Sequence, residues 1–289
     1  MFTTVISVQE LQALQASGQP HRVFDCSFDL TQPLAGGQQF NERRIAGALR
    51  ADPNEHLSTE KTDPDAASGG RHPLPSREAF ARWLDSIGFR NDMQAVVYDR
   101  QGSAFCGRLW WMLKWVGHEA VAVLDGGLQA WQAAQGAVEE GPAASPSVSV
   151  AGAFVLKPEA ARLVQTPTVM SQLGRPGFNL LDARAPQRYR GEVEPLDPVA
   201  GHIPGALNRP FTLNFSADGR FKPAAELRAE FETLLAGRDP TTVVHQCGSG
   251  VTATPNLIAM EIAGLGRAAL YAGSWSEWCS DPSRPVAQG

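Results

Sequence analysis

The segment best suited to chemistry runs from Val243 to Ala253 and reads Val-Val-His-Gln-Cys-Gly-Ser-Gly-Val-Thr-Ala. Strand-like residues lead into Cys247, a short loop with two glycines follows, and a helix is expected to begin near Thr252. Glycines let successive backbone amides turn into one concavity, and the helix N-terminus adds a partial positive charge there. Both features stabilise a thiolate, or a second anionic sulfur carried on it. The pattern therefore predicts that Cys247 is a nucleophile.

The remaining cysteines, Cys26, Cys106 and Cys279, lack this loop. Four isolated cysteines without a Cys-x-x-Cys pair are too few and too widely spaced for a disulfide framework or a structural zinc site. A free cysteine is most often a small buried side chain. We therefore expect Cys26 and Cys106 to be structural and Cys279, near the C-terminus, to be an exposed and oxidisable bystander. We expect no metal and no cofactor.

The chain contains two copies of one pattern. Val96–Asp99 and Val243–Gln246 both end apolar runs at an offset of 147 residues, and Trp131 matches Trp278 at the same offset. Held without gaps, this offset places Arg100 opposite Cys247. Only the second copy then carries the thiol, and the position is expected to face solvent in both copies.

The order of short apolar runs and amphipathic stretches predicts the fold class. Strands that alternate with helices form a parallel sheet covered by helices on both faces, and such sheets bind ligands at the carboxyl ends of their strands. We expect an α/β protein with an N-terminal domain at residues 1–136 and a C-terminal catalytic domain at residues 153–289. Residues 137–152 are rich in Gly, Pro, Ser and Ala and are expected to form the linker.

The composition argues against nucleic acid and membranes as binding partners. The 25 Lys and Arg against 30 Asp and Glu give a net charge of −5, and no basic cluster suited to nucleic acid is present. No apolar run is long enough to span a membrane. The N-terminus predicts a helix capped by Ser7 and Glu10, not a signal peptide. We therefore expect a cytoplasmic monomer that binds neither nucleic acid nor membrane.

Five motifs are spread over both halves of the chain, namely Cys247–Thr252, Gly201–Ala206, Trp110–Met112, Leu124–Gly127 and Gly273–Trp278. Together they resemble the two-domain rhodanese-type sulfurtransferases over essentially the whole chain. The resemblance implies two tandem rhodanese-like domains, of which only the C-terminal one is catalytic. The uncharged loop is similar to the 3-mercaptopyruvate sulfurtransferase branch, whereas the thiosulfate-preferring branch has basic residues just after the cysteine.

The resemblance also implies the reaction. Cys247 would take a sulfur atom from a small anionic sulfur donor as a persulfide and pass it to a second thiol or to cyanide. The accepting thiol would be thioredoxin-like or of low molecular weight. The amides from Gly248 to Thr252, with Gly250 and Val251 between them, would cradle the anion.

Three further residues are assigned by the same resemblance. Ser249 and His72 would form a relay with an acid beside the sulfur donor. The acid is open, because ungapped matching to the family places Asn54 at the usual position, while Asp52 lies close enough in sequence to orient His72.

Arg188 matches the family arginine that binds the carboxylate or sulfonate of the sulfur donor, a task that suits a planar guanidinium. The 3-mercaptopyruvate branch usually has a second arginine about nine residues later, but Leu196 and Asp197 stand there. Arg190 and Arg209 are the candidates to compensate.

Three other functions could use a cysteine in such a loop. A cysteine phosphatase needs an arginine six residues after its cysteine, and this chain has Ala253 there. A thiosulfate-preferring rhodanese and a persulfide carrier without turnover both stay open as alternatives.

Overall fold

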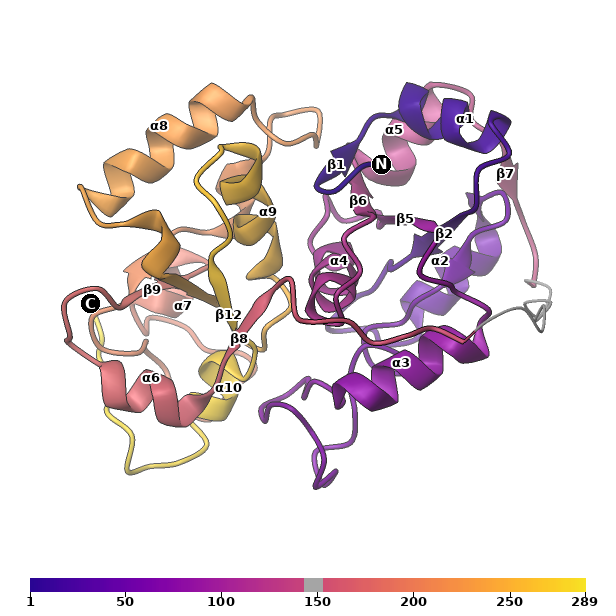
Figure 1. The fold of residues 1–289 in the computed structure, drawn as a ribbon. Coiled ribbons are helices and arrows are strands. Elements are labelled where there is room, and N and C mark those ends of the chain that lie inside the picture. The colour runs from indigo at the N-terminus through magenta and orange to yellow at the C-terminus, as the bar shows by residue number, and fades with distance from the viewer. Residues whose placement is uncertain (143–152) are drawn as a thin grey trace. The chain divides into compact units, whose positions relative to one another are not determined.

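The computed structural model describes residues 1–142 and 153–289 of the chain (Figure 1). The chain divides into two compact units. The N-terminal unit comprises Met1–Ser58, Pro75–Ala160 and Ala217–Arg220, and the C-terminal unit comprises Thr59–Leu74, Ala161–Ser216 and Phe221–Gly289.

The N-terminal unit is built on a parallel sheet flanked by helices (Figure 1). In spatial order its strands within the described residues are β1 (Val5–Ile6), β6 (Val121–Leu124), β5 (Gln94–Tyr98), β2 (His21–Asp25) and β4 (Leu49–Arg50). The helices are α1 (Val8–Ala16), α2 (Ala35–Glu42), α3 (Arg77–Ser86), α4 (Cys106–Trp115) and α5 (Gly127–Ala133).

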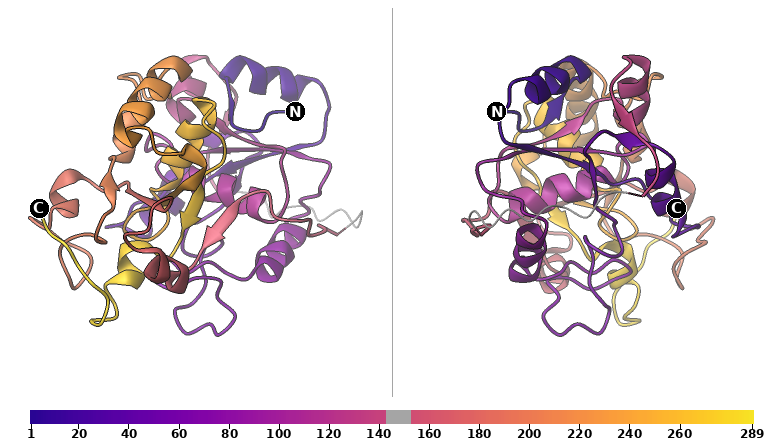
Figure 2. Two further views of the ribbon diagram at one scale, coloured as in Figure 1. Left: turned by 60° about the vertical axis from the view of Figure 1, so that its left-hand side comes forward. Right: turned by 90° about the vertical axis from the view of Figure 1, so that its right-hand side faces the viewer.

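The C-terminal unit repeats this architecture, with helices around a second parallel sheet (Figure 2). Its strands in spatial order are β10 (Leu207–Asn208), β9 (Asn179–Asp182), β11 (Val243–Gln246), β12 (Ala269–Tyr271) and β8 (Arg162–Val164). The helices are α6 (Thr166–Gln172), α7 (Pro186–Tyr189), α8 (Ala224–Leu235), α9 (Thr254–Ile262) and α10 (Ser274–Trp278), with short 3₁₀ turns η1 (Phe211–Asn214) and η2 (Pro240–Thr242).

The two sheets have the same strand order when β10, β9, β11, β12 and β8 are matched to β4, β2, β5, β6 and β1. The central strands β5 and β11 are buried along their whole length, as expected for parallel strands covered on both faces. Their apolar runs provide much of this burial. The structure confirms the predicted α/β class and the duplication.

The strand register corrects one part of the predicted alignment. The N–H of Trp275 donates to the carbonyl of Cys247 (3.1 Å), and in the first copy the N–H of Leu128 donates to the carbonyl of Asp99 (3.3 Å). Asp99, not Arg100, is therefore the counterpart of Cys247. The cause is one residue of helix, since α4 has 10 residues and α9 has 9, so the offset is 148 before the helix and 147 after it.

This correction also changes the expected environment. Asp99 and Cys247 are each 1% exposed, so the position is buried in both copies and does not face solvent. A thiol and a carboxylate thus occupy equivalent sites below the surface.

The predicted domain boundary falls on a segment that is only partly described. Val138–Glu139 forms strand β7 and pairs antiparallel with β3 (Arg44–Ile45) of the N-terminal unit. Residues 143–152 of the expected linker lie outside the described residues. Thr59–Leu74 groups with the C-terminal unit, where the N–H of Gly69 donates to the Glu277 carboxylate (3.0 Å). The division at residues 136 and 153 stays a prediction.

The four cysteines are free and buried. The expectation that Cys279 is exposed is wrong, because its side chain packs into the core of the C-terminal unit and is 5% exposed. Burial raises the pKa of the thiols of Cys26, Cys106 and Cys279 above its ordinary value. These three side chains are thereby kept as neutral thiols, which are poor nucleophiles. Among the helices of residues 1–142 and 153–289, none combines the length and apolar character needed to cross a membrane.

Candidate active site

Cys247 follows the carboxyl end of the central strand β11, and its loop leads into α9. The loop is tied to the start of α10. The N–H of Cys247 donates to Ser274 Oγ (3.1 Å), and the carbonyl of Gly248 accepts the N–H of Ser276 (2.9 Å). Backbone bonds on both sides of the thiol therefore hold the loop in one conformation.

Gly250 shows why the loop needs glycine. Its φ is +73°, in the left-handed region, and a Cβ built there would lie 2.2 Å from the carbonyl oxygen of Ala272. Any side chain would both strain the backbone and collide with the neighbouring chain. Glycine lets the loop approach that chain closely.

The first copy shows what such a loop binds. The Asp99 carboxylate accepts four backbone N–H groups from the residues that follow it, at distances of 2.8 to 2.9 Å. The groups belong to Gln101, Ser103, Phe105 and Cys106. The strand–loop–helix thus gathers donors around a negative charge on the residue at the end of the strand.

At the register described above, the corresponding N–H groups in the second copy belong to Ser249, Val251, Ala253 and Thr254. The group that corresponds to the Asp99 carboxylate is the side chain of Cys247. The internal copy therefore supports a loop suited to a thiolate or persulfide. Ser249 and Val251 belong to the predicted set Gly248–Thr252, whereas Ala253 and Thr254 lie beyond it toward α9.

The structure brings Ser249 and His72 together. His72 Nδ1 and Ser249 Oγ share a hydrogen bond of 2.7 Å, and each residue is 5% exposed. His72 lies in Thr59–Leu74, the segment that belongs to the C-terminal unit. The Ser249 hydroxyl is thereby linked to an imidazole, which can accept or donate a proton.

Asp52 has a different set of contacts. Its carboxylate accepts the guanidinium of Arg50 and the N–H groups of Asn54 (2.8 Å) and Glu55 (3.3 Å). It thus caps the turn after β4 within the N-terminal unit. That Asp52 orients His72 stays a prediction.

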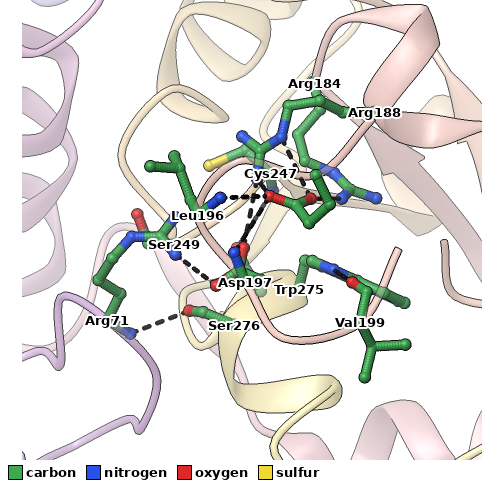
Figure 3. A network of polar contacts seen from close by, with 12 residues as sticks. Arg71, Arg184, Arg188, Leu196, Asp197, Val199, Cys247, Ser249, Trp275 and Ser276 are labelled. Carbon is green, nitrogen blue, oxygen red and sulfur yellow. Dashed lines mark hydrogen bonds and ion pairs between the residues drawn. The ribbon is translucent and has the colours of Figure 1, made fainter. Parts of the chain in front are cut away.

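Arg188 lies on the short helix α7 and is held by two acids. Its guanidinium pairs with Glu194 (2.6 Å) and Asp197 (3.2 Å). Figure 3 shows Arg188 and Asp197 in the surroundings of Cys247. A Cβ built on Gly248 would lie 3.4 Å from Arg188 Nη1. The predicted anion-binding arginine therefore lies beside the residue that follows the nucleophile.

Arg184 was missed by sequence reasoning. Its guanidinium pairs with Asp182 (2.7 Å) and Glu194 (3.3 Å) and stacks on Trp275. Burial opposes its charged form, but the negative charges of Asp182 and Glu194 prevail and raise its pKa. Arg184 is therefore a permanent cation of the site. The only signal for it was the repeated aspartate at the ends of β2 and β9.

A second arginine was also missed. Arg71 pairs with Asp197, and its Nη2 lies 3.0 Å from the position of a Cβ on Gly248. The candidates named from the sequence have other partners, since Arg190 pairs with Glu192 (2.6 Å) and Arg209 pairs with Glu230 (2.7 Å).

Comparison with known proteins agrees with the duplicated fold. The rhodanese-like domain model matches residues 7–134 and 166–281. A "Probable 3-mercaptopyruvate sulfurtransferase" of Pseudomonas aeruginosa is 46% identical over 286 residues, covering 99% of this chain and 98% of the relative. A thiosulfate sulfurtransferase of Bos taurus is 34% identical, covering 93% of this chain and 89% of the relative.

Solved structures agree as well. The crystal structure of the 3-mercaptopyruvate sulfotransferase SseA from Escherichia coli matches with a TM-score of 0.76 at 29% identity, covering 95% of this chain and 100% of that one. A 3-mercaptopyruvate sulfurtransferase from Leishmania major matches with a TM-score of 0.79 at 30% identity, covering 96% of this chain and 74% of that one. The chain belongs to the rhodanese family and carries two rhodanese-like domains.

Proposed function

We propose that this protein is a sulfurtransferase that takes a sulfur atom from 3-mercaptopyruvate onto Cys247 and delivers it to a thiol or to cyanide. The observation that carries the proposal is the Cys247 loop, whose counterpart surrounds the Asp99 carboxylate with four N–H donors. Donors fixed in advance around a negative charge stabilise it without reorganisation during the reaction. Relatives with both sulfurtransferase names support the same chemistry.

The first half-reaction forms the persulfide. The Cys247 thiolate attacks the sulfur of 3-mercaptopyruvate, an S–S bond forms, and the C–S bond breaks with its electron pair moving to carbon as the pyruvate enolate. The proton from the thiol of 3-mercaptopyruvate passes to that carbon and gives pyruvate. Ser249 and His72, joined by a bond of 2.7 Å, are the pair able to relay it.

The second half-reaction restores the enzyme. The acceptor thiolate attacks the outer sulfur, so that its new S–S bond replaces the one to Cys247, and the Cys247 thiolate departs as the leaving group. Cyanide in place of the thiol gives thiocyanate. The loop amides favour this departure because they stabilise the thiolate. The expected kinetics are therefore ping-pong.

The charges favour 3-mercaptopyruvate over thiosulfate. Gly248 and Ser249 carry no charge. The guanidiniums of the site are balanced by acids: Arg71, Arg184 and Arg188 pair with Asp182, Glu194 and Asp197. A site without net positive charge does not offset the larger cost of removing a dianion from water, compared with a single carboxylate. The thiosulfate-preferring reading remains the alternative.

The test of this function is the ratio of kcat/KM for the two sulfur donors, measured as pyruvate and sulfite release. We expect 3-mercaptopyruvate to be preferred by at least about tenfold, a difference of about 1.4 kcal/mol. A preference for thiosulfate would contradict the assignment of the sulfur donor. Negligible turnover with both would replace the enzyme by a persulfide carrier loaded by another protein.

The setting of the reaction follows from its acceptor. A thioredoxin-like or low-molecular-weight thiol is abundant in a reducing compartment, and we propose that the protein works in the cytoplasm as a monomer. Sedimentation at micromolar concentration measures the oligomeric state.

Replacing Arg188 by alanine is expected to raise KM for either anionic sulfur donor by about tenfold to a hundredfold, because a charge-assisted guanidinium–carboxylate bond is lost. The kcat should change far less, since the substrate carboxylate is bound alike before and during sulfur transfer. Arg188→Lys should fall between the two, because lysine keeps the charge without the planar pair of N–H groups. Unchanged KM values would remove Arg188 from the site.

A further inference from the structure

We propose that Arg71 supplies the second guanidinium for the carboxylate of the sulfur donor, with Asp197 as the acid that positions it. The inference rests on the proposed function and adds a residue to its binding site. Asp197 stands where the resemblance to the 3-mercaptopyruvate branch implies a second arginine. The structure offers a cation from another part of the C-terminal unit, 126 residues away in sequence.

The backbone of Arg71 is anchored beside the catalytic loop. Its N–H donates to Ser276 Oγ (2.9 Å), and Ser276 in turn donates its own N–H to the carbonyl of Gly248 (2.9 Å). Gly70 has a φ of +89°, and a Cβ there would lie 2.7 Å from the Gly273 carbonyl oxygen. This close contact fixes the start of the Arg71 side chain relative to α10.

The guanidinium of Arg71 reaches the same face of Gly248 as that of Arg188. A Cβ built on Gly248 would lie 3.0 Å from Arg71 Nη2 and between 3.4 and 3.6 Å from the Nη atoms of Arg188. Two guanidiniums therefore converge on the space beside the residue that follows the nucleophile. A side chain at position 248 would contact both of them.

Asp197 joins the two arginines. Its carboxylate pairs with Arg71 through one oxygen and with Arg188 through the other (3.2 Å), and the side chain is only 4% exposed (Figure 3). An arginine at position 197 would carry its own charge, whereas the acid holds Arg71 in place. Asp197 thus places a negative charge where a positive one was expected, and Arg71 supplies the positive charge from another segment.

Arg71 keeps capacity for a ligand. Its side chain is 22% exposed, and the pair with Asp197 uses Nη1. Nη2 is the guanidinium nitrogen beside Gly248, so its N–H groups can meet a carboxylate bound there. A cavity of about 360 Å³ is lined by Arg71, Leu196 and Asp197, among other residues of the same unit.

The experiment compares Arg71→Ala and Arg71→Gln with the wild-type enzyme. Two quantities are measured, namely KM and kcat for 3-mercaptopyruvate and the inhibition constant of pyruvate, which has the carboxylate and lacks the sulfur. We expect both KM and the inhibition constant to rise by about tenfold to a hundredfold, while kcat stays within about threefold. The glutamine variant keeps two methylene groups and a polar end without the charge, so it decides the matter if the alanine variant fails to fold.

The matched control is Arg175→Ala. Arg175 is an exposed arginine of the same unit, in the segment between α6 and β9. We expect its KM and inhibition constant to equal those of the wild-type enzyme. Unchanged constants in the Arg71 variants, with an active wild-type enzyme, would overturn the role of Arg71 alone. A wild-type enzyme without turnover would instead refute the proposed function.

Discussion

Replacing Cys247 by serine is expected to lower kcat for sulfur transfer from 3-mercaptopyruvate by at least about a thousandfold, as the loss of a covalent nucleophile does elsewhere. A serine hydroxyl is hardly ionised at neutral pH and cannot store sulfur as a persulfide. The cysteines Cys26, Cys106 and Cys279 cannot substitute, because burial raises the pKa of each thiol. Pyruvate release measures the loss. A serine variant with substantial turnover would exclude Cys247 as the sulfur carrier.

The same position tests the anion-binding loop. Cys247→Asp should be as inactive as the serine variant, but it should melt higher than Cys247→Asn, because only the carboxylate reproduces the charge of Asp99 among the loop amides. About 1 kcal/mol corresponds to a difference in Tm of about 2 to 4 °C for a domain of this size. Calorimetry of the two isosteric variants gives the comparison. An aspartate variant that melts below the asparagine variant would argue against the shared loop chemistry.

The second large effect concerns Asp99 itself. Asp99→Asn is expected to lower the free energy of unfolding of the N-terminal unit by about 3 kcal/mol, because an amide NH₂ replaces an oxygen that accepts two buried N–H groups. Burial raises the pKa of Asp99, so this carboxylate depends on those donors for its stability. The kcat of the variant should stay close to that of the wild-type enzyme.

Urea unfolding of Asp99→Asn measures the loss, with Asp92→Asn as the control. Asp92 is an exposed acid of the same unit that pairs with Arg90 at the surface. Its replacement should cost less than about 1 kcal/mol, as is usual for exposed ion pairs. Equal stabilities of the two variants would show that the four N–H contacts contribute little.

The fold could be predicted because its pattern is local and repeated. Apolar runs such as Val96–Val97 and Val243–Val244 lie in fully buried strands, and turn glycines recur in both halves. The register could not be predicted from a constant offset. One residue lost from α9 relative to α4 moves Asp99, instead of Arg100, opposite Cys247. A gap of one residue inside a helix leaves no mark in composition.

The part of the site that was predicted consists of residues in short local motifs. Cys247 and Ser249 lie in one loop, and the residues that match family motifs, Arg188 and His72, lie close to it. Arg71 was missed because its partner Asp197 is 126 residues away, and no spacing rule connects them. In the sequence, Asp197 was noted only because an arginine was expected at that position. In three dimensions it binds two arginines.

The most direct test is the mass of the intact protein after treatment with 3-mercaptopyruvate in the absence of any acceptor. We expect a gain of one sulfur atom for each molecule of pyruvate released, located on the peptide that contains Cys247 and removed by cyanide as thiocyanate. Pyruvate released without added sulfur on the protein, or sulfur found on Cys26, Cys106 or Cys279 instead, would contradict a Cys247 persulfide.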